Sequence, residues 1–306
     1  MTPDQYTIQE IFVDVGHGHT LYVQEWGDTR GLPIIFLHGG PGNGCNDTHR
    51  QTFDPDRQHV IFIDQRGTGR SLPHGSMAHN TTQDLIADIE KVVVQLKLPP
   101  FVLTGGSWGS CLALAYGLAH PKRVRAMVLD GIFTGSQSEI NYLDQGSFQV
   151  HFPDVWEWLT KQVPRREQAD PVTHLAHKAL GNGPASIRAA YLYGQLERSL
   201  LSLDDRFTPP PLADYDPSSI RIELYYMKNR CFMPDQYILQ NAHRLSMPVW
   251  LIQGRYDMVC PGKTAYALHK RLKNSELIWA TSGHRGEREV WNIRRSILLQ
   301  LAKGVE

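Results

Sequence analysis

A serine flanked by glycines, between a strand-like and a helix-like segment, is the chain's strongest indication of chemistry. The run Gly105-Gly106-Ser107-Trp108-Gly109 follows the apolar residues 101–104 and precedes the small, apolar residues 110–119. A Gly-x-Ser-x-Gly run in this context predicts a nucleophile elbow, a sharp turn that lifts the serine hydroxyl clear of a sheet. Glycines are expected there because a Cβ atom would collide with the neighbouring strand and helix. Ser107 is therefore the candidate nucleophile.

A serine nucleophile needs a base that accepts its proton and a carboxylate that orients the base. After such an elbow, the acid and then the base follow in chain order, on loops beyond the carboxyl ends of later strands. Asp257 follows the strand-like residues 249–253, and His284 follows the strand-like residues 276–279. These positions predict Asp257 as the orienting carboxylate and His284 as the general base. The alternative for Asp257 is a turn-stabilising role.

A glycine-rich run after an early strand predicts the other half of the reaction site. The oxyanion of a tetrahedral intermediate is held by fixed backbone N–H groups, one of them from the residue after the nucleophile. That residue is Trp108, and the run His38-Gly39-Gly40-Pro41-Gly42 offers the second donor, which we predict to be Gly40. A simple Gly-Pro turn is the alternative. His38 itself is expected to be a structural hydrogen-bonding residue rather than a second base.

The loop at residues 64–71 contains a Gly-x-Gly that resembles part of a phosphate-binding turn. It lacks the third glycine and a following helix, and Pro73 interrupts it, which argues against dinucleotide binding. Asp64 and Arg66 are instead expected to brace loops beneath the active site through charge-assisted hydrogen bonds.

Strand-like and helix-like segments alternate along much of the chain, which predicts an α/β fold with a mostly parallel, doubly wound sheet. Residues 8–15 and 20–26 predict a hairpin. Apolar runs without alternation at 33–37 and 60–63 are typical of strands buried on both faces of a parallel sheet. Further strands are expected at 101–104, 124–129, 248–253 and 276–279, and helices at 84–97, 110–119, 262–272 and 287–302.

This alternation is interrupted in the middle of the chain. Residues 135–244 are rich in Trp, Tyr and Leu at helical spacing and are broken by proline-bearing joints. We expect this segment to form a helical cap inserted into a core made of residues 1–134 and 245–306.

Composition and charge argue against several classes of protein. Among 306 residues, 31 Lys and Arg balance 31 Asp and Glu, which does not favour nucleic acid or an anionic membrane as a partner. Four widely spaced cysteines without metal-ligand spacing predict reduced thiols and no metal. The chain shows neither a secretory leader nor an apolar stretch of membrane-spanning length. We therefore expect a soluble, cytoplasmic protein.

Taken together, these segments resemble the proline iminopeptidases (prolyl aminopeptidases), a branch of the α/β-hydrolase fold. The most specific of them are residues 38–42, 64–71, 105–109 and 254–261 (Gly-Arg-Tyr-Asp-Met-Val-Cys-Pro). The resemblance covers nearly the whole chain. It implies an α/β-hydrolase with an inserted helical cap, a serine peptidase that releases N-terminal proline through an acyl-enzyme, and no metal or organic cofactor.

The resemblance also implies two amine-binding glutamates in the cap. Glu223 matches one of them, within residues 222–230, and Glu197 is the match for the second. The chain departs from the family at Tyr193 and Leu196, where the family usually has tryptophan. Two alternatives stay open: a solvated helix face for both glutamates, and an esterase or amidase acting on small molecules through an altered cap.

Overall fold

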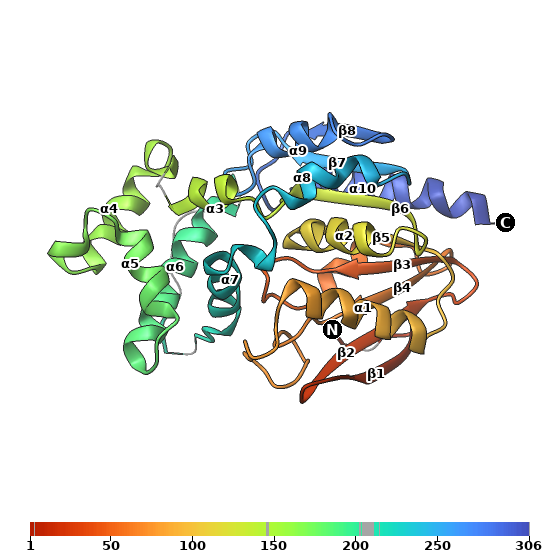
Figure 1. The fold of residues 1–306 in the computed structure, drawn as a ribbon, viewed down its shortest axis with the longest axis horizontal. Helices are drawn as coiled ribbons and strands as arrows, with labels where there is room; N and C mark the ends of the chain where they lie inside the picture. Colours follow the sequence, from red (N-terminus) through yellow and green to blue (C-terminus); the bar gives the residue numbers. More distant parts are fainter. Residues whose placement is uncertain (3, 145–146, 202, 204–210, 214, 306) are drawn as a thin grey trace.

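An eight-stranded sheet organises the part of the chain that the computed structural model describes, residues 1–2, 4–144, 147–201, 203, 211–213 and 215–305. The strand order is β1-β2-β4-β3-β5-β6-β7-β8. The pairs β1–β2 and β2–β4 are antiparallel and all others are parallel (Figure 1). The predicted α/β fold with a mostly parallel sheet is confirmed. The strands are β1 (Thr7–Gly16), β2 (His19–Gly27), β3 (Leu32–Leu37), β4 (Gln58–Ile63), β5 (Phe101–Ser107), β6 (Val124–Ile132), β7 (Val249–Gly254) and β8 (Ser275–Ala280).

Helices cover both faces of the sheet because its central strands are apolar on both sides. In β3, Ile35 and Leu37 join one hydrophobic cluster, and Ile34 and Phe36 join another on the opposite face. The first cluster includes side chains of α1, α2 and α9, and the second includes side chains of α10. The sheet is therefore doubly wound. These helices are α1 (Thr82–Gln95), α2 (Trp108–Ala119), α9 (Gly262–His269) and α10 (Glu287–Ala302).

A second group of helices, α3 to α7, lies to one side of the sheet (Figure 1). Prolines stand at the first turns of α4 and α5, where a missing N–H costs nothing. The short α8 lies against α2 instead. The helices are α3 (Gln137–Asp144), α4 (Pro153–Gln162), α5 (Pro171–Ala179), α6 (Pro184–Leu201), α7 (Ser218–Lys228) and α8 (Tyr237–Asn241). Single 3₁₀ turns are Asp47–Thr52, Ser147–Val150, Arg165–Glu167, Arg230–Phe232, Ala242–Arg244 and Lys303–Val305.

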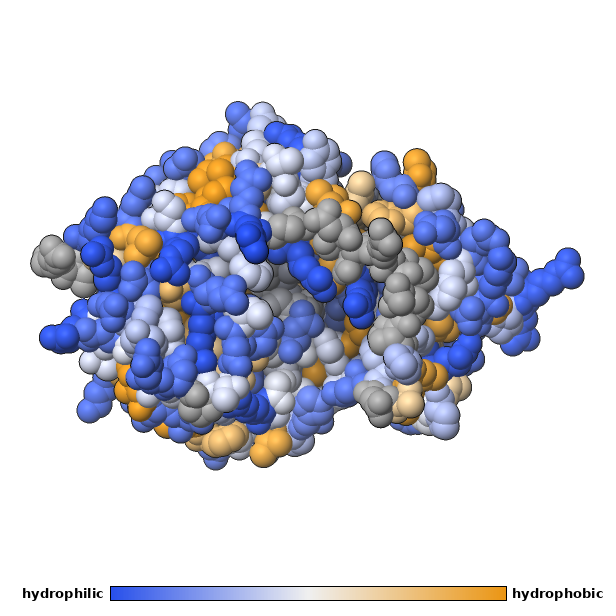
Figure 2. All heavy atoms as spheres, turned by 180° about the vertical axis from the view of Figure 1, so that it is seen from behind, coloured by the Kyte–Doolittle hydropathy of each residue, from blue (hydrophilic) through white to orange (hydrophobic). Residues whose placement is uncertain are grey.

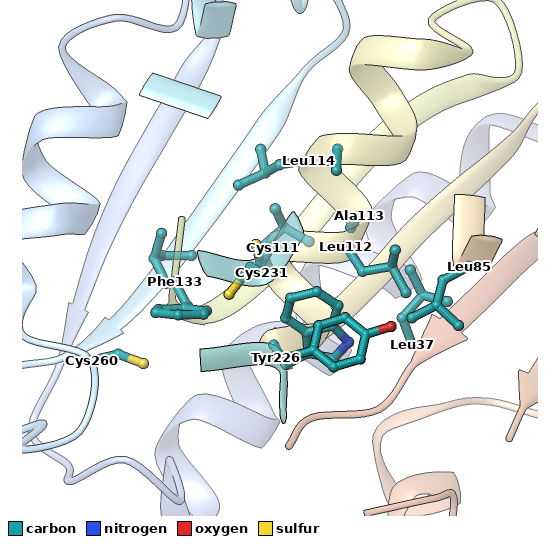
Figure 3. Packing of buried hydrophobic residues seen from close by; sticks show 14 of the residues in the cluster. Leu37, Leu85, Cys111, Leu112, Ala113, Leu114, Phe133, Tyr226, Cys231 and Cys260 are labelled. Atoms are coloured by element: carbon teal, nitrogen blue, oxygen red, sulfur yellow. The ribbon is translucent and has the colours of Figure 1, made fainter. Parts of the chain in front are cut away.

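Helix α7 is attached to the start of α2 through buried side chains. The ring of Tyr226 packs edge-on against Trp108, with centroids 4.8 Å apart, and its hydroxyl donates to Asn80 Oδ1 at 2.8 Å. Close to this contact, Cys231 and Cys111 both border Gly135. Figure 3 shows Tyr226 and Cys231 among the side chains of α2. The hydrophobic core therefore continues from the sheet layer into α7.

The surface fits the balanced charge of the chain. Figure 2 shows a face on which hydrophilic residues predominate and hydrophobic ones stand in small groups. Across the described ranges, no helix combines the length and the apolar character needed to cross a membrane.

Candidate active site

Ser107 lies in a tight turn that requires glycine at neighbouring positions. It ends β5 and precedes α2, with φ 56° and ψ −126°, a strained conformation for a residue other than glycine. A Cβ atom on Gly105 would lie 2.4 Å from the carbonyl oxygen of Leu37, and one on Gly109 would lie 2.1 Å from it. The collision predicted for larger residues is confirmed, and the predicted strand-turn-helix corner is present.

Asp257 and His284 form a buried pair on the loops that follow β7 and β8. Nδ1 of His284 lies 2.9 and 3.0 Å from the two carboxylate oxygens of Asp257. The Asp257 carboxylate also accepts the backbone N–H groups of Val259 and Cys260, at 2.9 and 2.7 Å. Because Nδ1 must donate to the carboxylate, Nε2 is the basic nitrogen of the neutral ring.

The electrostatic environment of His284 favours its protonated form. Burial lowers the pKa of His284, but the charge of Asp257 and the hydrogen bond to its carboxylate outweigh this effect and hold the pKa well above 6.5. Burial in turn raises the pKa of the Cys260 thiol to about 11, so Cys260 is a neutral partner at neutral pH. The contact between Cys260 and His284 was missed from the sequence, where Cys260 is only a cysteine close to Asp257.

Gly131, at the end of β6, marks where Ser107 and His284 meet. A Cβ atom built on Gly131 would lie 3.4 Å from Cε1 of His284 and 3.6 Å from the backbone nitrogen of Ser107. Its φ of +50° also favours glycine. The structure thus brings Ser107, Asp257 and His284 together at the carboxyl edge of the sheet, although the last two lie far from Ser107 in the sequence.

The glycine-rich run after β3 passes directly beside Ser107. A Cβ atom on Gly39 would lie 3.5 Å from Cβ of Ser107, and Gly40, with φ +108°, lines the same pocket as Ser107. Helix α2 begins at Trp108, which puts the positive end of the helix dipole beside the hydroxyl. Both residues predicted to donate backbone N–H groups to an oxyanion are therefore adjacent to the candidate nucleophile.

A buried hydrogen-bond network joins His38, at the start of the glycine-rich run, to Trp108 through Gln65. The amide of Gln65 donates to the His38 carbonyl at 3.0 Å, and its oxygen accepts the indole N–H of Trp108 at 2.8 Å. Nδ1 of His38 donates to the Gly39 carbonyl at 2.9 Å, while Nε2 accepts the Gln65 backbone N–H at 3.1 Å. Burial lowers the pKa of His38, which keeps the ring neutral. His38 is a structural residue, as predicted.

Charged side chains hold the loop at residues 64–71 in place, as the sequence predicted. Asp64 accepts the backbone N–H groups of Cys45 and Arg70, at 2.6 and 2.9 Å. Arg66 donates from Nε and Nη2 to the carboxylate of Asp88, at 2.6 and 2.7 Å, and both side chains are buried. The loop that carries Gln65 is therefore held on both sides.

Ser107 opens into a pocket that also contains Glu197 of α6 and Glu223 of α7. The side chains of the two glutamates are hydrogen-bonded to each other. Burial raises the pKa of Glu197, and the bond to Glu223 and the charge of His284 offset part of this effect. The structure thus places Glu197 and Glu223 in the pocket rather than on a solvated face. The lining residues are Gly40, Ser107, Phe133, Glu139, Ile140, Tyr193, Glu197, Glu223, Met227, Val259 and Cys260.

The carboxylate of the third acidic residue of the pocket, Glu139, already accepts hydrogen bonds from the protein itself. Its carboxylate accepts the backbone N–H groups of Thr134 and Ser136 and the Ser136 hydroxyl, at 3.1, 3.0 and 2.8 Å. Glu197 and Glu223 are therefore the acidic groups better placed to meet a ligand. No cluster of His, Cys, Asp and Glu suited to a metal ion occurs within the described part of the chain.

Comparison with known proteins agrees with this geometry. Residues 33–285 match the family described as the alpha/beta hydrolase fold. A probable proline iminopeptidase of Leptolyngbya boryana is 40% identical over 270 residues, covering 85% of this chain and 83% of that protein. The proline iminopeptidase of Arabidopsis thaliana is 37% identical over 282 residues, covering 87% and 72%. The chain belongs to the proline iminopeptidase family.

Solved structures that resemble this member of the proline iminopeptidase family are more distant in sequence. The esterase EaEST of Exiguobacterium antarcticum has a TM-score of 0.62 at 20% identity, covering 96% of this chain and all of that one. The proline iminopeptidase of Mycobacterium smegmatis has a TM-score of 0.59 at 18% identity, covering 97% and 98%. At these identities the likeness shows the shared fold alone, which is the α/β-hydrolase fold.

The Gln65 network predicts a measurable loss of stability in Gln65→Leu. The change leaves the Trp108 indole N–H and the His38 carbonyl buried without their partner, at a cost of about 1–3 kcal/mol for each group. We expect the free energy of unfolding, measured by urea denaturation, to fall by at least about 2 kcal/mol. Gln51→Leu, at an exposed position, is the control. Equal urea midpoints for the two variants would contradict the network's role.

Proposed function

We propose that this protein is a serine peptidase that releases N-terminal proline from peptides through an acyl-enzyme intermediate. The observation that carries the proposal is the presence of Glu197 and Glu223 in the same pocket as Ser107. An N-terminal amine is one bond away from the α-carbon that bears the scissile carbonyl. A site that recognises this amine must therefore adjoin the nucleophile, and paired carboxylates are suited to bind a cation.

In the proposed acylation step, Ser107 attacks the carbonyl carbon of proline while Nε2 of His284 accepts the hydroxyl proton. Asp257 holds the ring in the orientation that this transfer requires and stabilises the imidazolium. The N–H groups of Gly40 and Trp108 bind the oxyanion. His284 then returns the proton to the leaving amine, the C–N bond breaks, and the shortened peptide departs. A water molecule, activated by His284, hydrolyses the acyl-enzyme and releases proline.

The charge state of the glutamate pair supports recognition of a cationic amine. One proton is shared by the hydrogen-bonded carboxyl groups of Glu197 and Glu223, because two buried like charges in contact repel each other. When an ammonium group binds, the shared proton is released to solvent and the ammonium group donates hydrogen bonds to both carboxylates. Phe133 and Tyr193 line the same pocket and offer ring surfaces to the apolar part of proline. Leu196, the other departure from the family, packs in the core.

We further propose that residues 135–244 act as the cap that selects the substrate, since Glu197, Glu223 and Tyr193 all belong to this segment. We also propose the cytoplasm as the compartment in which the protein acts. In support, the chain carries four free thiols, at Cys45, Cys111, Cys231 and Cys260, and reducing compartments maintain such thiols.

The nucleophile is tested by Ser107→Ala. We expect kcat on proline-naphthylamide to fall on the order of 10⁴-fold or more, as in other serine hydrolases that lose a member of the triad. Labelling by a fluorophosphonate probe is expected in the wild type and lost in the variant. Near-normal turnover by folded, purified Ser107→Ala would rule out the proposed chemistry.

The raised pKa of His284 predicts the pH dependence of the reaction. Below its pKa the ring is protonated and accepts no proton, so kcat/KM rises as the pH passes upward through that pKa. We expect the acidic limb of the profile to lie above pH 6.5 and to move to lower pH in Asp257→Asn. An acyl ester without an amine, assayed in parallel, separates His284 from the titration of the substrate. A limb that does not respond to Asp257→Asn would contradict this assignment.

Amine recognition is tested by Glu223→Gln, which keeps the shape of the side chain and removes its charge. Loss of one partner of a buried charge pair predicts a fall in kcat/KM for proline-naphthylamide on the order of 10²-fold. Cleavage of a short acyl ester is expected to persist. The control is Glu157→Gln, on the exposed side of α4. If the wild type prefers the acyl ester, or if both substrates suffer equally, an esterase or amidase is the better assignment.

A further inference from the structure

A second cavity adjoins the active-site pocket between α3, α5 and α7. Its volume is about 370 Å³, within the range of sites that bind small ligands. Ile140 and Met227 line both this cavity and the pocket that contains Ser107. These two side chains therefore form the boundary across which a substrate would extend from one space into the other. We call the second cavity the outer groove. Its polar lining residues are Gln137, Thr173, His177, Lys228 and Arg230.

The outer groove and the active-site pocket carry opposite charges. Lys228 and Arg230 line the groove, and no Asp or Glu is among its described lining residues. The pocket has three glutamates and no Lys or Arg among its own. Lys228 and Arg230 are both exposed, and neither forms an ion pair with another residue in the described ranges. The two cations are thus available to an anionic group of a ligand.

Helix α7 sets the distance between the acidic and the basic ends. Side chains four residues apart share a face of a helix, so Glu223 and Met227 face the pocket while Leu224 and Lys228 face the groove. Lys228 follows Glu223 by five positions, which is a rise of about 7.5 Å along the axis at 1.5 Å per residue. An extended peptide of two or three residues spans about 7–11 Å. Because the two side chains also point to different faces of α7, a peptide of two or three residues is the shortest that could reach from one charge to the other.

Arg230 is held in place by an unusual turn at the end of α7. Arg230, Cys231 and Phe232 have φ values of 53°, 51° and 53°, a left-handed conformation that costs energy in residues other than glycine. Two hydrogen bonds from α1 stabilise it: Thr82 Oγ1 donates to the Cys231 carbonyl at 2.5 Å, and Gln83 Nε2 donates to the Phe232 carbonyl at 2.7 Å. A strained backbone conformation persists only where surrounding contacts hold it in place. The backbone from which the Arg230 side chain extends is therefore fixed.

We propose that the outer groove is a carboxylate-binding subsite, in which Lys228 and Arg230 receive the C-terminal carboxylate of a two- or three-residue peptide whose N-terminal amine lies at Glu197 and Glu223. This inference rests on the proposed function and narrows it to short peptides with a free C-terminus. The substrate is a zwitterion whose charges match those of the two cavities. In this binding mode the prolyl carbonyl lies at Ser107, in the pocket of the glutamates, and the rest of the peptide extends past Ile140 and Met227 into the groove.

The test compares free-acid and amide forms of the same peptides. We expect the wild type to cleave prolylglycine and prolylglycylglycine with a KM about 10-fold lower than that of their C-terminal amides, because two partly exposed charge contacts are lost in the amides. In the double variant Lys228→Gln/Arg230→Gln, the acid and the amide are expected to become equal. Turnover of proline-naphthylamide, which has no carboxylate, is expected to stay at the wild-type rate.

The matched control is Lys178→Gln/Arg188→Gln, which removes the same net charge at exposed positions of α5 and α6 outside the groove lining. This control is expected to keep the preference for the acid. Prolylglutamate amide, whose only carboxylate is in a side chain, distinguishes recognition of an acidic residue from recognition of the chain end. If the wild type treats acid and amide alike, or if the Lys228/Arg230 variant keeps the preference, the proposed subsite is wrong.

Failure of the subsite is distinguishable from failure of the proposed function. Cleavage of proline-naphthylamide with equal KM values for acid and amide would overturn the subsite and leave the peptidase proposal standing. If proline-naphthylamide is not cleaved, calorimetric titration of Ser107→Ala with prolylglycine and its amide decides the matter separately. Tighter binding of the acid, lost with Lys228→Gln/Arg230→Gln, supports the subsite. Equal or absent binding overturns it.

Discussion

The close approach of the nucleophile turn to the end of β3 is the constraint on which the site depends. The carbonyl oxygen of Leu37 leaves no room for a Cβ atom on Gly105 or Gly109. Because β3 and β5 are parallel neighbours, the same approach puts the residues after Leu37 beside Ser107. One backbone contact thus positions both the nucleophile and the glycine-rich run. Gln65 adds hydrogen bonds to the His38 carbonyl of that run and to the indole of Trp108, the residue after the nucleophile.

Neighbouring groups give the titratable residues of the site different protonation behaviour and therefore different roles. Asp257 and His284 form a pair in which the ring gains a proton easily, whereas His38, buried without a carboxylate partner, stays neutral and structural. Glu197 and Glu223 line one pocket with their side chains hydrogen-bonded, and burial raises the pKa of Glu197. Two histidines and several carboxylates therefore behave differently because of their neighbours, and the residue types alone do not predict this difference.

Much of the fold and the positions of Ser107, Asp257 and His284 could be predicted because each signal is local. Apolar runs predict buried strands, and a polar residue directly after such a run lies at the carboxyl edge of the sheet. Local signals were also overlooked: α1 begins at Thr82, two residues before the predicted start, because Thr81 and Asp84 form a capping box.

The walls of the pocket could not be predicted in this way. Ile140 and Met227 have the helical spacing of ordinary core residues, and only the arrangement of their two helices in space makes them line the same cavities. The bond between Gln65 and Trp108 likewise depends on two loops that are distant in the sequence. Contacts between segments are set by the tertiary fold, which no short pattern encodes.

The contact between Tyr226 of α7 and Trp108 has a consequence for which parts of the protein can vary in sequence. Its ring packs the helix that bears Glu223 against Trp108, the residue after the reactive serine, and its hydroxyl bonds Asn80 ahead of α1. Helices α4 and α5 contribute no residue to the described lining of the inner pocket. Substitutions in these two helices can therefore change the outer layer of the molecule without replacing any residue that lines the inner pocket.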